Sequence, residues 1–273
     1  MSQHLPTYVL IACVIIALAW EALAPRRPEQ AGLGIRWLHN FGLTYLGQMT
    51  ARGLGMLTPL AAAWVGQHYG FGLFQQVELG FIPVFLATML VYELAGYVSH
   101  YLFHNVPLLW RLHAVHHNDV ELDISTTYRH HPLELVITYC LVLPLILLLS
   151  PPVEVLLLYQ SIQITIHVFA HSNIYLPQRV NRVLNYFIVT PDFHRLHHCS
   201  DKRFTNSNYG TVIPWLDHLF GTASSRPFEE QKTMQLGLEY ARDARDSRLD
   251  QMLLLPFRSK AGFYSSPDAE EPG

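Results

Sequence analysis

Charged side chains are scarce in this chain of 273 residues, where Asp, Glu, Lys and Arg together make up 14%. Soluble domains contain about a quarter charged residues. Because half of the chain is also hydrophobic, this shortage of charge indicates a protein that lies in lipid. The formal net charge of -3 comes without a dense basic stripe, which argues against a nucleic-acid partner.

Cysteine is scarce too, and its three copies, Cys13, Cys140 and Cys199, lie far apart. Cys13 and Cys140 fall inside apolar runs, where a free cysteine behaves as a small hydrophobic residue. No two cysteines have the close spacing of a zinc finger. The sequence therefore supports neither a zinc finger nor a disulfide framework.

Long apolar runs are what the chain has in abundance. A helix needs about 20 residues, with a range of about 17 to 25, to cross the hydrocarbon core of a bilayer. Five runs fit: Leu5–Leu23, Phe41–Val65, Gly80–Ser99, Leu133–Leu149 and Val153–Ala170. They predict an all-α, multi-span membrane protein with about four to five transmembrane helices. Only Ser150-Pro151-Pro152 separates the last two runs, so a hairpin that does not fully cross remains open.

The basic residues predict the orientation of these spans. No Lys or Arg precedes the first run, and Arg26 and Arg27 follow it, which is typical of a retained span whose C-terminal end is cytoplasmic. Further basic residues occur at Arg111, at Arg129 and from Arg179 onward. With the N-terminus outside, all of these positions fall on the cytoplasmic side, and only Arg52, within the second run, breaks the pattern.

Ten of the sixteen histidines fall into four groups near the ends of apolar runs. The order is pair, triple, pair, triple: His100 and His104; His113, His116 and His117; His167 and His171; His194, His197 and His198. Residues three or four apart project from one face of a helix. Each group can therefore present two or three imidazoles to one point, and together they predict a histidine-rich helical cap on the cytoplasmic side.

Imidazole is a common ligand of zinc, copper, iron and nickel. Ten ligands exceed what one ion binds, whereas two ions with about five nitrogens each use them all. The chain contains neither the Glu-x-x-His of soluble di-iron bundles nor the His-Glu-x-x-His of zinc proteases. At this point a di-zinc membrane hydrolase and a non-catalytic metal-binding or transport protein both remain alternatives. Bis-histidine haem ligation would explain one pair but not two triples.

The four histidine groups resemble those of the fatty acid hydroxylase/sterol desaturase superfamily. Three further stretches are similar to that family: Leu109-Trp110-Arg111-Leu112-His113, Arg129-His130-His131-Pro132-Leu133-Glu134 and Trp215-Leu216-Asp217-His218-Leu219-Phe220-Gly221-Thr222. The resemblance covers about half of the chain, from Phe81 to Thr222. It implies that all ten histidines bind metal, as they do in the family.

The resemblance further implies an integral-membrane, non-haem di-iron oxidoreductase that uses O2 to hydroxylate or desaturate a C–H bond of a lipid. Zinc is a conceivable substitute for iron, but zinc cannot change oxidation state. No haem, flavin or ferredoxin motif is present, so the electrons are expected from an external reductase, cytochrome or ferredoxin. The identity of the lipid, and the choice between hydroxylation and desaturation, stay open.

Smaller features complete the sequence-based expectations. Thr190-Pro191-Asp192 has the pattern of a helix start, and Asp192 is expected either in that first turn or beside a metal-bound imidazole. His131 is expected either to line the site or simply to precede the helix that starts at Pro132. We divide the chain into N-terminal helices (1–79), a hydroxylase-like catalytic domain (80–222) and a polar tail (223–273). Within the tail, Leu249–Phe257 is expected at the membrane surface.

Overall fold

The computed structural model describes residues 5–28 and 33–258, and these residues form helices and loops without a β-strand. Five helices are long: α1 (Leu5–Leu23), α2 (Leu33–Gly53), α4 (Phe81–Asn105), α6 (Pro132–Leu149) and α7 (Val153–His171). The shorter α-helices are α3 (Pro59–Tyr69), α5 (Pro107–His117), α8 (Gln178–Leu184), α9 (Pro191–His197), α10 (Lys202–Thr205), α11 (Trp215–Phe220), α12 (Phe228–Thr233) and α13 (Leu249–Leu254). Short 3-10 turns are η2 (Leu73–Gln75), η3 (Ile124–Tyr128), η4 (Ala244–Ser247) and η5 (Leu255–Phe257).

Within residues 5–28 and 33–258, three helices, α4, α6 and α7, are long and apolar enough to cross a membrane. The all-α, multi-span prediction is therefore confirmed. Helix α1 coincides with the first predicted run, and its part Val14–Leu23 is a shorter apolar helix. Large apolar side chains face outward from these helices; Leu90 and Leu148, for example, are 59% and 66% exposed, as lipid-facing residues are.

The predicted second run, Phe41–Val65, is wrong as a single helix. Helix α2 ends at Gly53, and the chain turns through Gly55, whose φ of 70° lies in the left-handed region that glycine tolerates. Helix α3 then begins with Thr58 as its cap and Pro59 in its first turn. The run therefore divides between two shorter helices.

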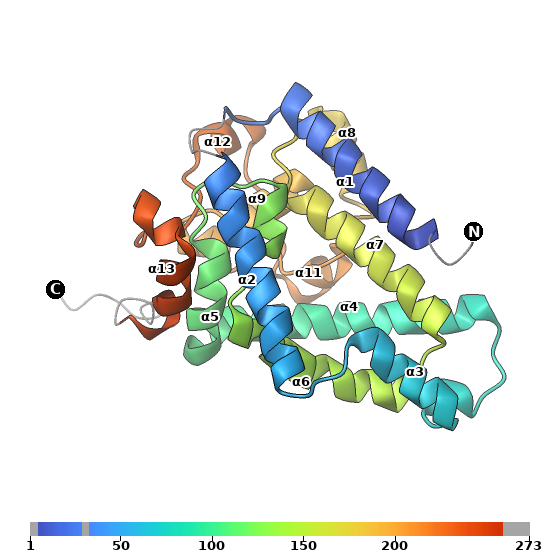
Figure 1. The fold of residues 1–273 in the computed structure, drawn as a ribbon. Helices are drawn as coiled ribbons and strands as arrows, with labels where there is room; N and C mark the ends of the chain where they lie inside the picture. The colour runs from blue at the N-terminus through green and yellow to red at the C-terminus, as the bar shows by residue number, and fades with distance from the viewer. Residues whose placement is uncertain (1–4, 29–32, 259–273) are drawn as a thin grey trace.

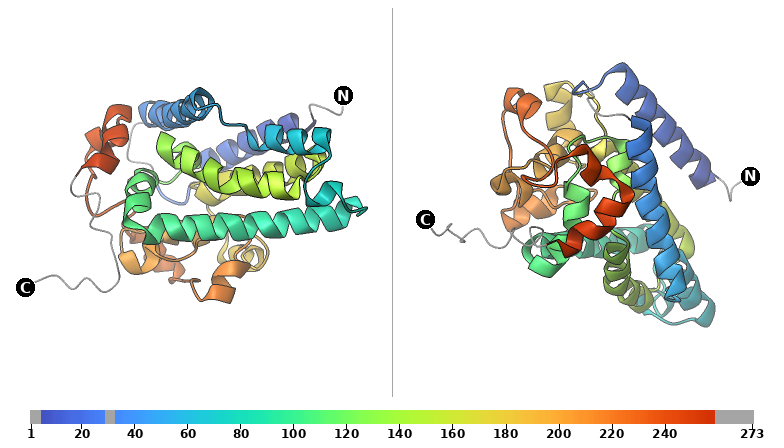
Figure 2. Two further views of the ribbon diagram at one scale, coloured as in Figure 1. Left: turned by 90° about the horizontal axis from the view of Figure 1, so that it is seen from below. Right: turned by 60° about the vertical axis from the view of Figure 1, so that its left-hand side comes forward.

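The long helices are layered around α4. Helices α4 and α6 run beside each other, α7 crosses them with α1 alongside, and α2 lies across α6 (Figure 1). Seen from below, the chain around α11 lies on the other side of α4 from α6 and α7, whereas α13 lies on the same side as α2 (Figure 2). Tyr92, Ile146 and Tyr159 form a buried core where α4, α6 and α7 meet.

The segment Leu249–Phe257, which the sequence predicts at the membrane surface, packs on one side against other helices. Its Met252 and Leu255 are buried against Leu43 of α2 and Val115 of α5, although Phe257 is exposed. The end of the described chain therefore covers the back of the helix that carries the first histidine triple.

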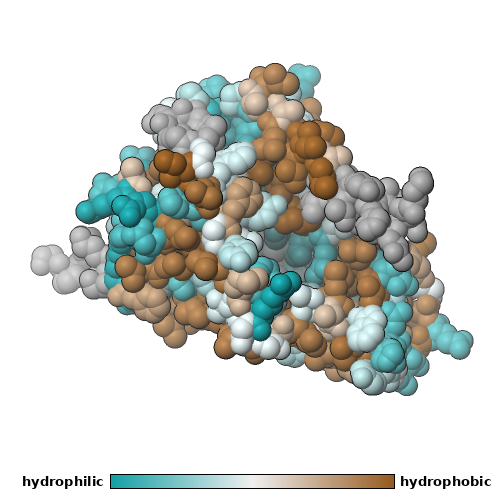
Figure 3. All heavy atoms as spheres, viewed as in Figure 1, coloured by the Kyte–Doolittle hydropathy of each residue, from teal (hydrophilic) through white to brown (hydrophobic). Residues whose placement is uncertain are grey.

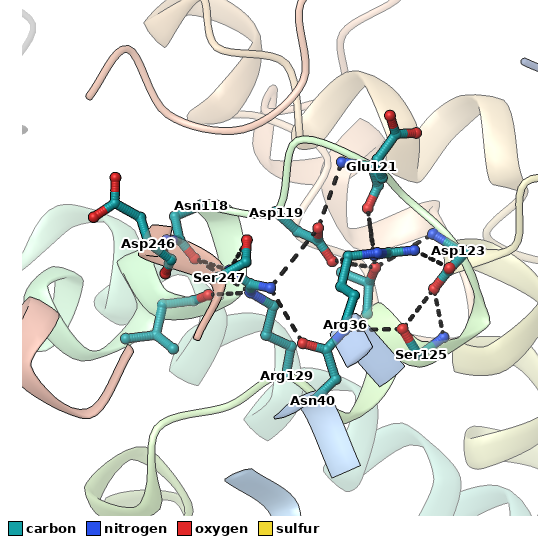
Figure 4. Close-up of polar contacts among 12 residues, drawn as sticks. Arg36, Asn40, Asn118, Asp119, Glu121, Asp123, Ser125, Arg129, Asp246 and Ser247 are labelled. Carbon is teal, nitrogen blue, oxygen red and sulfur yellow. Dashed lines mark hydrogen bonds and ion pairs between the residues drawn. The ribbon is translucent and has the colours of Figure 1, made fainter. Parts of the chain in front are cut away.

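A buried charge network fixes the loop that follows α5. Arg36 of α2 pairs with Asp119, at 2.8 Å, and with Asp123, while Arg129 donates hydrogen bonds to Asn40 and Asn118 (Figure 4). Buried charges are tolerated only when they are paired and hydrogen-bonded. The network thereby holds α2 against the chain on both sides of η3.

Candidate metal centre

The four histidine groups lie on four helix segments that meet in the interior. The two pairs occupy the C-terminal ends of α4 and α7, and the two triples lie on α5 and at the end of α9. The local sequence determines where α5 and α9 begin. Pro107 stands at the first turn of α5, and Thr190 accepts a hydrogen bond from the amide of Phe193 at the start of α9.

One cluster contains five histidines whose ligand nitrogens all lie within 4.8 Å of one another. Its members come from three helices: His100 and His104 from α4, His113 and His117 from α5, and His197 from α9. We call this group the five-histidine cluster.

A second cluster contains four histidines, with His116 from α5, His171 from α7, and His194 and His198 from α9 and its cap. The Nε2 atom of His171 lies 3.2 Å from that of His116 and 2.9 Å from that of His194. The Nε2 atoms of His194 and His198 are 3.2 Å apart. We call this group the four-histidine cluster.

Each triple is divided between the two clusters. From α5, His113 and His117 enter the five-histidine cluster while His116 enters the four-histidine cluster. From α9 and its cap, His197 enters the five-histidine cluster, whereas His194 and His198 enter the four-histidine cluster. The clusters are therefore neighbours, because the same two helices supply both.

The hydrogen bonds of the five-histidine cluster leave its nitrogens ready to bind a cation. The Nδ1 atoms of His100, His104, His113 and His197 each lie against an oxygen acceptor, at 2.9, 3.3, 2.8 and 2.6 Å. A ring that donates from Nδ1 carries its lone pair on Nε2. The Nε2 atoms of all five members are buried without a hydrogen-bond partner in the described structure.

The four-histidine cluster has nitrogen spacings that suit an ion. A metal about 2.1 Å from each of two nitrogens at right angles sets those nitrogens about 3.0 Å apart. The observed separations of 3.2, 2.9 and 3.2 Å lie close to that value. The residues present therefore fit a metal at this cluster as well.

Burial keeps these imidazoles in the form that binds metal. Burial lowers the pKa of five cluster histidines on α5 and at the end of α9 well below its ordinary value, and the neighbouring imidazoles lower the pKa further. These five residues are His116, His117, His194, His197 and His198. A neutral imidazole has a free lone pair, whereas an imidazolium has none.

Three residues singled out from the sequence lie outside the clusters. His167 lines a cavity one turn before His171, whose Nδ1 donates to the His167 carbonyl at 2.8 Å. His131 caps α6, accepting from the amide of Leu133 at 3.2 Å. Asp192 lies in the first turn of α9 and pairs with Arg26 at 3.4 Å.

Two residues that sequence reasoning did not assign to the site contact it directly. One oxygen of Glu134 accepts from Nδ1 of His113 at 2.8 Å and from Nδ1 of His130 at 2.9 Å. The ring of His130 stacks on that of His116, with 4.4 Å between centroids. Burial lowers the pKa of His130, but Glu134 raises it more, and the net shift is upward. In the sequence, the one signal for this contact was the spacing of four residues between His130 and Glu134 at the start of an apolar run.

An apolar cavity of about 680 Å³ reaches the histidines from the membrane part. Its wall includes Leu60 of α3, Val142 of α6 and Ile164 of α7, and His100, His116 and His194 lie along it. Figure 3 shows the surface hollowed between α2 and α7, with hydrophobic residues around the opening. Buried nitrogen ligands thus border a space that suits an alkyl chain.

The fold and the site together define a class: a multi-span helical membrane protein with paired histidine clusters beside an apolar cavity. The chain belongs to the fatty acid hydroxylase family, whose pattern it matches over residues 85–222. This confirms the resemblance seen in the sequence. It also places the chain among the oxidoreductases that hydroxylate lipids.

Among characterised relatives, ornithine lipid hydroxylase OlsE of Rhizobium tropici is 30% identical over 232 residues, which are 80% of this chain and 67% of the relative. Alkylglycerol monooxygenase of Homo sapiens is 29% identical over 128 residues, or 46% of this chain and 27% of the relative. The Xenopus tropicalis enzyme of the same name is 25% identical over 138 residues, 50% of this chain and 29% of the relative. The chain thus matches less than a third of these two monooxygenases. No solved structure matches it significantly.

Proposed function

We propose that the protein is a non-haem di-iron monooxygenase that hydroxylates a C–H bond of a membrane lipid with O2 and external electrons. The observation that carries this proposal is the convergence of nine histidines, eight of them buried, in two adjoining clusters at the end of an apolar cavity. The names of the relatives support a lipid as the substrate, since they act on ornithine lipids and alkylglycerols.

Iron suits the reaction better than zinc. Cleaving an unactivated C–H bond exceeds what acidic and basic side chains can do, so a redox metal is needed, and zinc has no accessible redox change. Two iron ions would supply the electron-transfer chemistry that activates O2. Hydroxylation places one oxygen atom in the C–H bond and reduces the other to water, which consumes two electrons and two protons.

The protein's own residues hold, orient and seal this site. The five-histidine and four-histidine clusters would each hold one ion, and His167, beside His171, would complete the second set to five ligands. Glu134 orients His113 through its Nδ1 hydrogen bond. The apolar cavity would position an alkyl chain with one carbon near His100, His116 and His194 and would exclude bulk water.

We also propose an external electron donor and a metal site on the cytoplasmic side. The sequence carries no recognisable redox-carrier motif, so a separate reductase, cytochrome or ferredoxin would deliver electrons to the side where the histidines lie. The basic residues Arg111 and Arg195 adjoin the two triples, which supports a cytoplasmic metal site under the positive-inside rule. Labelling of a cysteine introduced at the exposed Arg203, which follows the second triple, is expected from the cytoplasmic side.

The decisive experiment uses the full chain purified in lipid nanodiscs with a reductase, candidate lipids and ¹⁸O2. We expect about two iron ions per chain, O2 uptake that depends on lipid, and one ¹⁸O atom in the product. Zinc with hydrolytic turnover and no O2 uptake would contradict the proposal. A desaturated product without ¹⁸O would retain the di-iron centre but replace hydroxylation with desaturation.

A further inference from the structure

One loop supplies most of the oxygen acceptors for the five-histidine cluster. The loop, residues 206–213, follows α10 and is called the acceptor loop here. Its Asn206 Oδ1 lies 3.3 Å from Nδ1 of His104, and the carbonyl of Ser207 lies 2.6 Å from Nδ1 of His197. The carbonyl of Tyr209 lies 2.9 Å from Nδ1 of His100. Three of the five imidazoles are thus oriented by one short stretch of chain.

These contacts determine where each ring carries its proton. A carbonyl oxygen can only accept, so the facing Nδ1 must be the donor and Nε2 must carry the lone pair. Outer hydrogen bonds of this kind fix the tautomer and orientation of ligating histidines, and their loss typically weakens metal binding about 10–100-fold. The position of the acceptor loop therefore determines the ring orientation of His100, His104 and His197 in the five-histidine cluster.

A buried carboxylate outside the cluster holds one end of the acceptor loop. Asp217 is fully buried; its two oxygens accept from the amides of Tyr209 and Gly210, each at 2.7 Å, and Oδ1 also accepts from Thr222 at 2.7 Å. The approach is close, because a Cβ atom on Gly210 would lie 2.9 Å from Asp217. Asp217 fixes the same peptide segment whose carbonyl orients His100.

A second carboxylate, on the transmembrane helix α4, holds the other end. One oxygen of Glu93 accepts from the amides of Val212 and Ile213, at 3.1 and 3.2 Å, and from the hydroxyl of Thr211 at 3.1 Å. Its other oxygen accepts from Tyr159 at 2.8 Å. A carboxylate in a membrane-spanning helix is costly unless it is satisfied, and such residues usually have a specific role. Here four donors satisfy it, and three of them belong to the acceptor loop.

In the described part of the chain, the imidazoles of the four-histidine cluster have no comparable set of hydrogen-bond acceptors. The Nδ1 atoms of His116, His194 and His198 are buried without a hydrogen-bond partner in the part of the chain that the structure describes. His171 donates to a carbonyl of its own helix. The acceptor loop thus serves one cluster and not the other.

We propose that Asp217 and Glu93 are positioning residues that act through the acceptor loop on the five-histidine cluster alone. This inference rests on the proposed function, since it presumes that each cluster holds a metal ion. Under this proposal the two ions differ in how they are held. The ion at the five-histidine cluster is bound by ligands that are already oriented, whereas the ion at the four-histidine cluster is bound by ligands that are freer to reorient.

Metal titration of the full-length protein tests the inference. Asp217→Asn keeps the side-chain shape, but its NH2 group cannot accept from a backbone amide. We expect this variant to bind one ion normally and the other about 10–100-fold more weakly. Glu93→Gln is expected to have the same effect. Restoring the carboxylate with Asp217→Glu should recover part of the lost affinity, which a general loss of folding would not show.

Asp246→Asn is the matched control. Asp246 is a buried carboxylate that accepts from the amide of Asp243 at 3.2 Å and from Arg258 at 3.0 Å, away from the acceptor loop. The Asp246→Asn variant should bind both ions with unchanged affinity. Loss of both ions or of neither in Asp217→Asn would overturn the inference, as would an equal effect in Asp246→Asn. A wild-type protein that binds no metal would instead overturn the proposed function.

Discussion

The Nε2 atoms of His171 and His194 lie 2.9 Å apart, although the two residues come from the end of α7 and from α9. Two imidazole lone pairs at this distance repel each other unless a proton or a cation lies between them. An ion bound there would stabilise the contact between the two helices.

Chelation is expected to lower the thermal stability of the purified protein. A ligand present at about 100 times its Kd stabilises the folded state by about 2.7 kcal/mol for each site. The measurement compares unfolding temperatures before chelation, after it, and after iron is returned. An unchanged unfolding temperature, with metal analysis showing that the ions have gone, would contradict this expectation.

Substitution of one histidine from each triple is expected to affect different ions. His116→Ala removes a ligand from the four-histidine cluster and His197→Ala removes one from the five-histidine cluster. Each should lose metal at its own cluster and should lower turnover more than about 100-fold, beyond the loss typical of an outer hydrogen-bond partner. Metal content and product formation are the measurements. Full activity in both variants would refute the ligand assignment.

His39→Ala and His68→Ala are the matched controls for those substitutions. Neither histidine belongs to a cluster, and His68 is exposed and stacks on Trp64. Both variants should retain their metal and remain within a few-fold of normal activity.

Narrowing the apolar cavity is expected to impair substrate binding without affecting the metal. Val142 of α6 lines the cavity, so Val142→Trp should exclude long alkyl chains and raise the apparent KM for them at normal metal content. Its neighbour Leu141 is 39% exposed and does not line the cavity. Leu141→Trp should therefore behave as wild type. Equal kinetics for the two variants would show that the substrate does not occupy this cavity.

Breaking the charge network beside the site is expected to destabilise the fold. Arg36→Met leaves the buried carboxylates of Asp119 and Asp123 without that guanidinium. Removing one partner of a buried ion pair typically costs about 3–5 kcal/mol. The unfolding temperature of the detergent-solubilised variant is the measurement. As an exposed control, Arg203→Met removes a pair with Asp201 on the surface and should change stability little.

The helical pattern and the ligand-bearing faces were predictable from the sequence because both depend on local spacing. Intervals of three and four residues place His113 on one face with His116 and His117. How the triple divides between two clusters depends on the angle at which α5 meets α4, α7 and α9, and no local pattern encodes that angle. Arg52, Gly53 and Gly55 mark the break in the run Phe41–Val65, but it was missed because the apolar residues on both sides were treated as one span.

The contacts that support the ligands could not be predicted, since they join distant parts of the chain. Glu134 reaches back to His113, and the carbonyl of Tyr209 reaches His100 from 109 residues away. The start of α9 was predictable from Thr190 and Pro191, because capping is local. The division into residues 1–79, 80–222 and 223–273 stays a prediction.

The division of both triples between the clusters also constrains how the protein is made. A chain synthesised only through α5 carries His100, His104, His113, His116 and His117, but neither cluster is complete until α9 has followed. Four of the nine clustered histidines lie at or beyond His171. A metal ion that needs a complete cluster can therefore bind only after α7, the last membrane-length helix, and α9 have been made. A ribosome that stalls before His198 leaves a membrane-inserted product whose four-histidine cluster is incomplete, so metal content would report how far synthesis has gone.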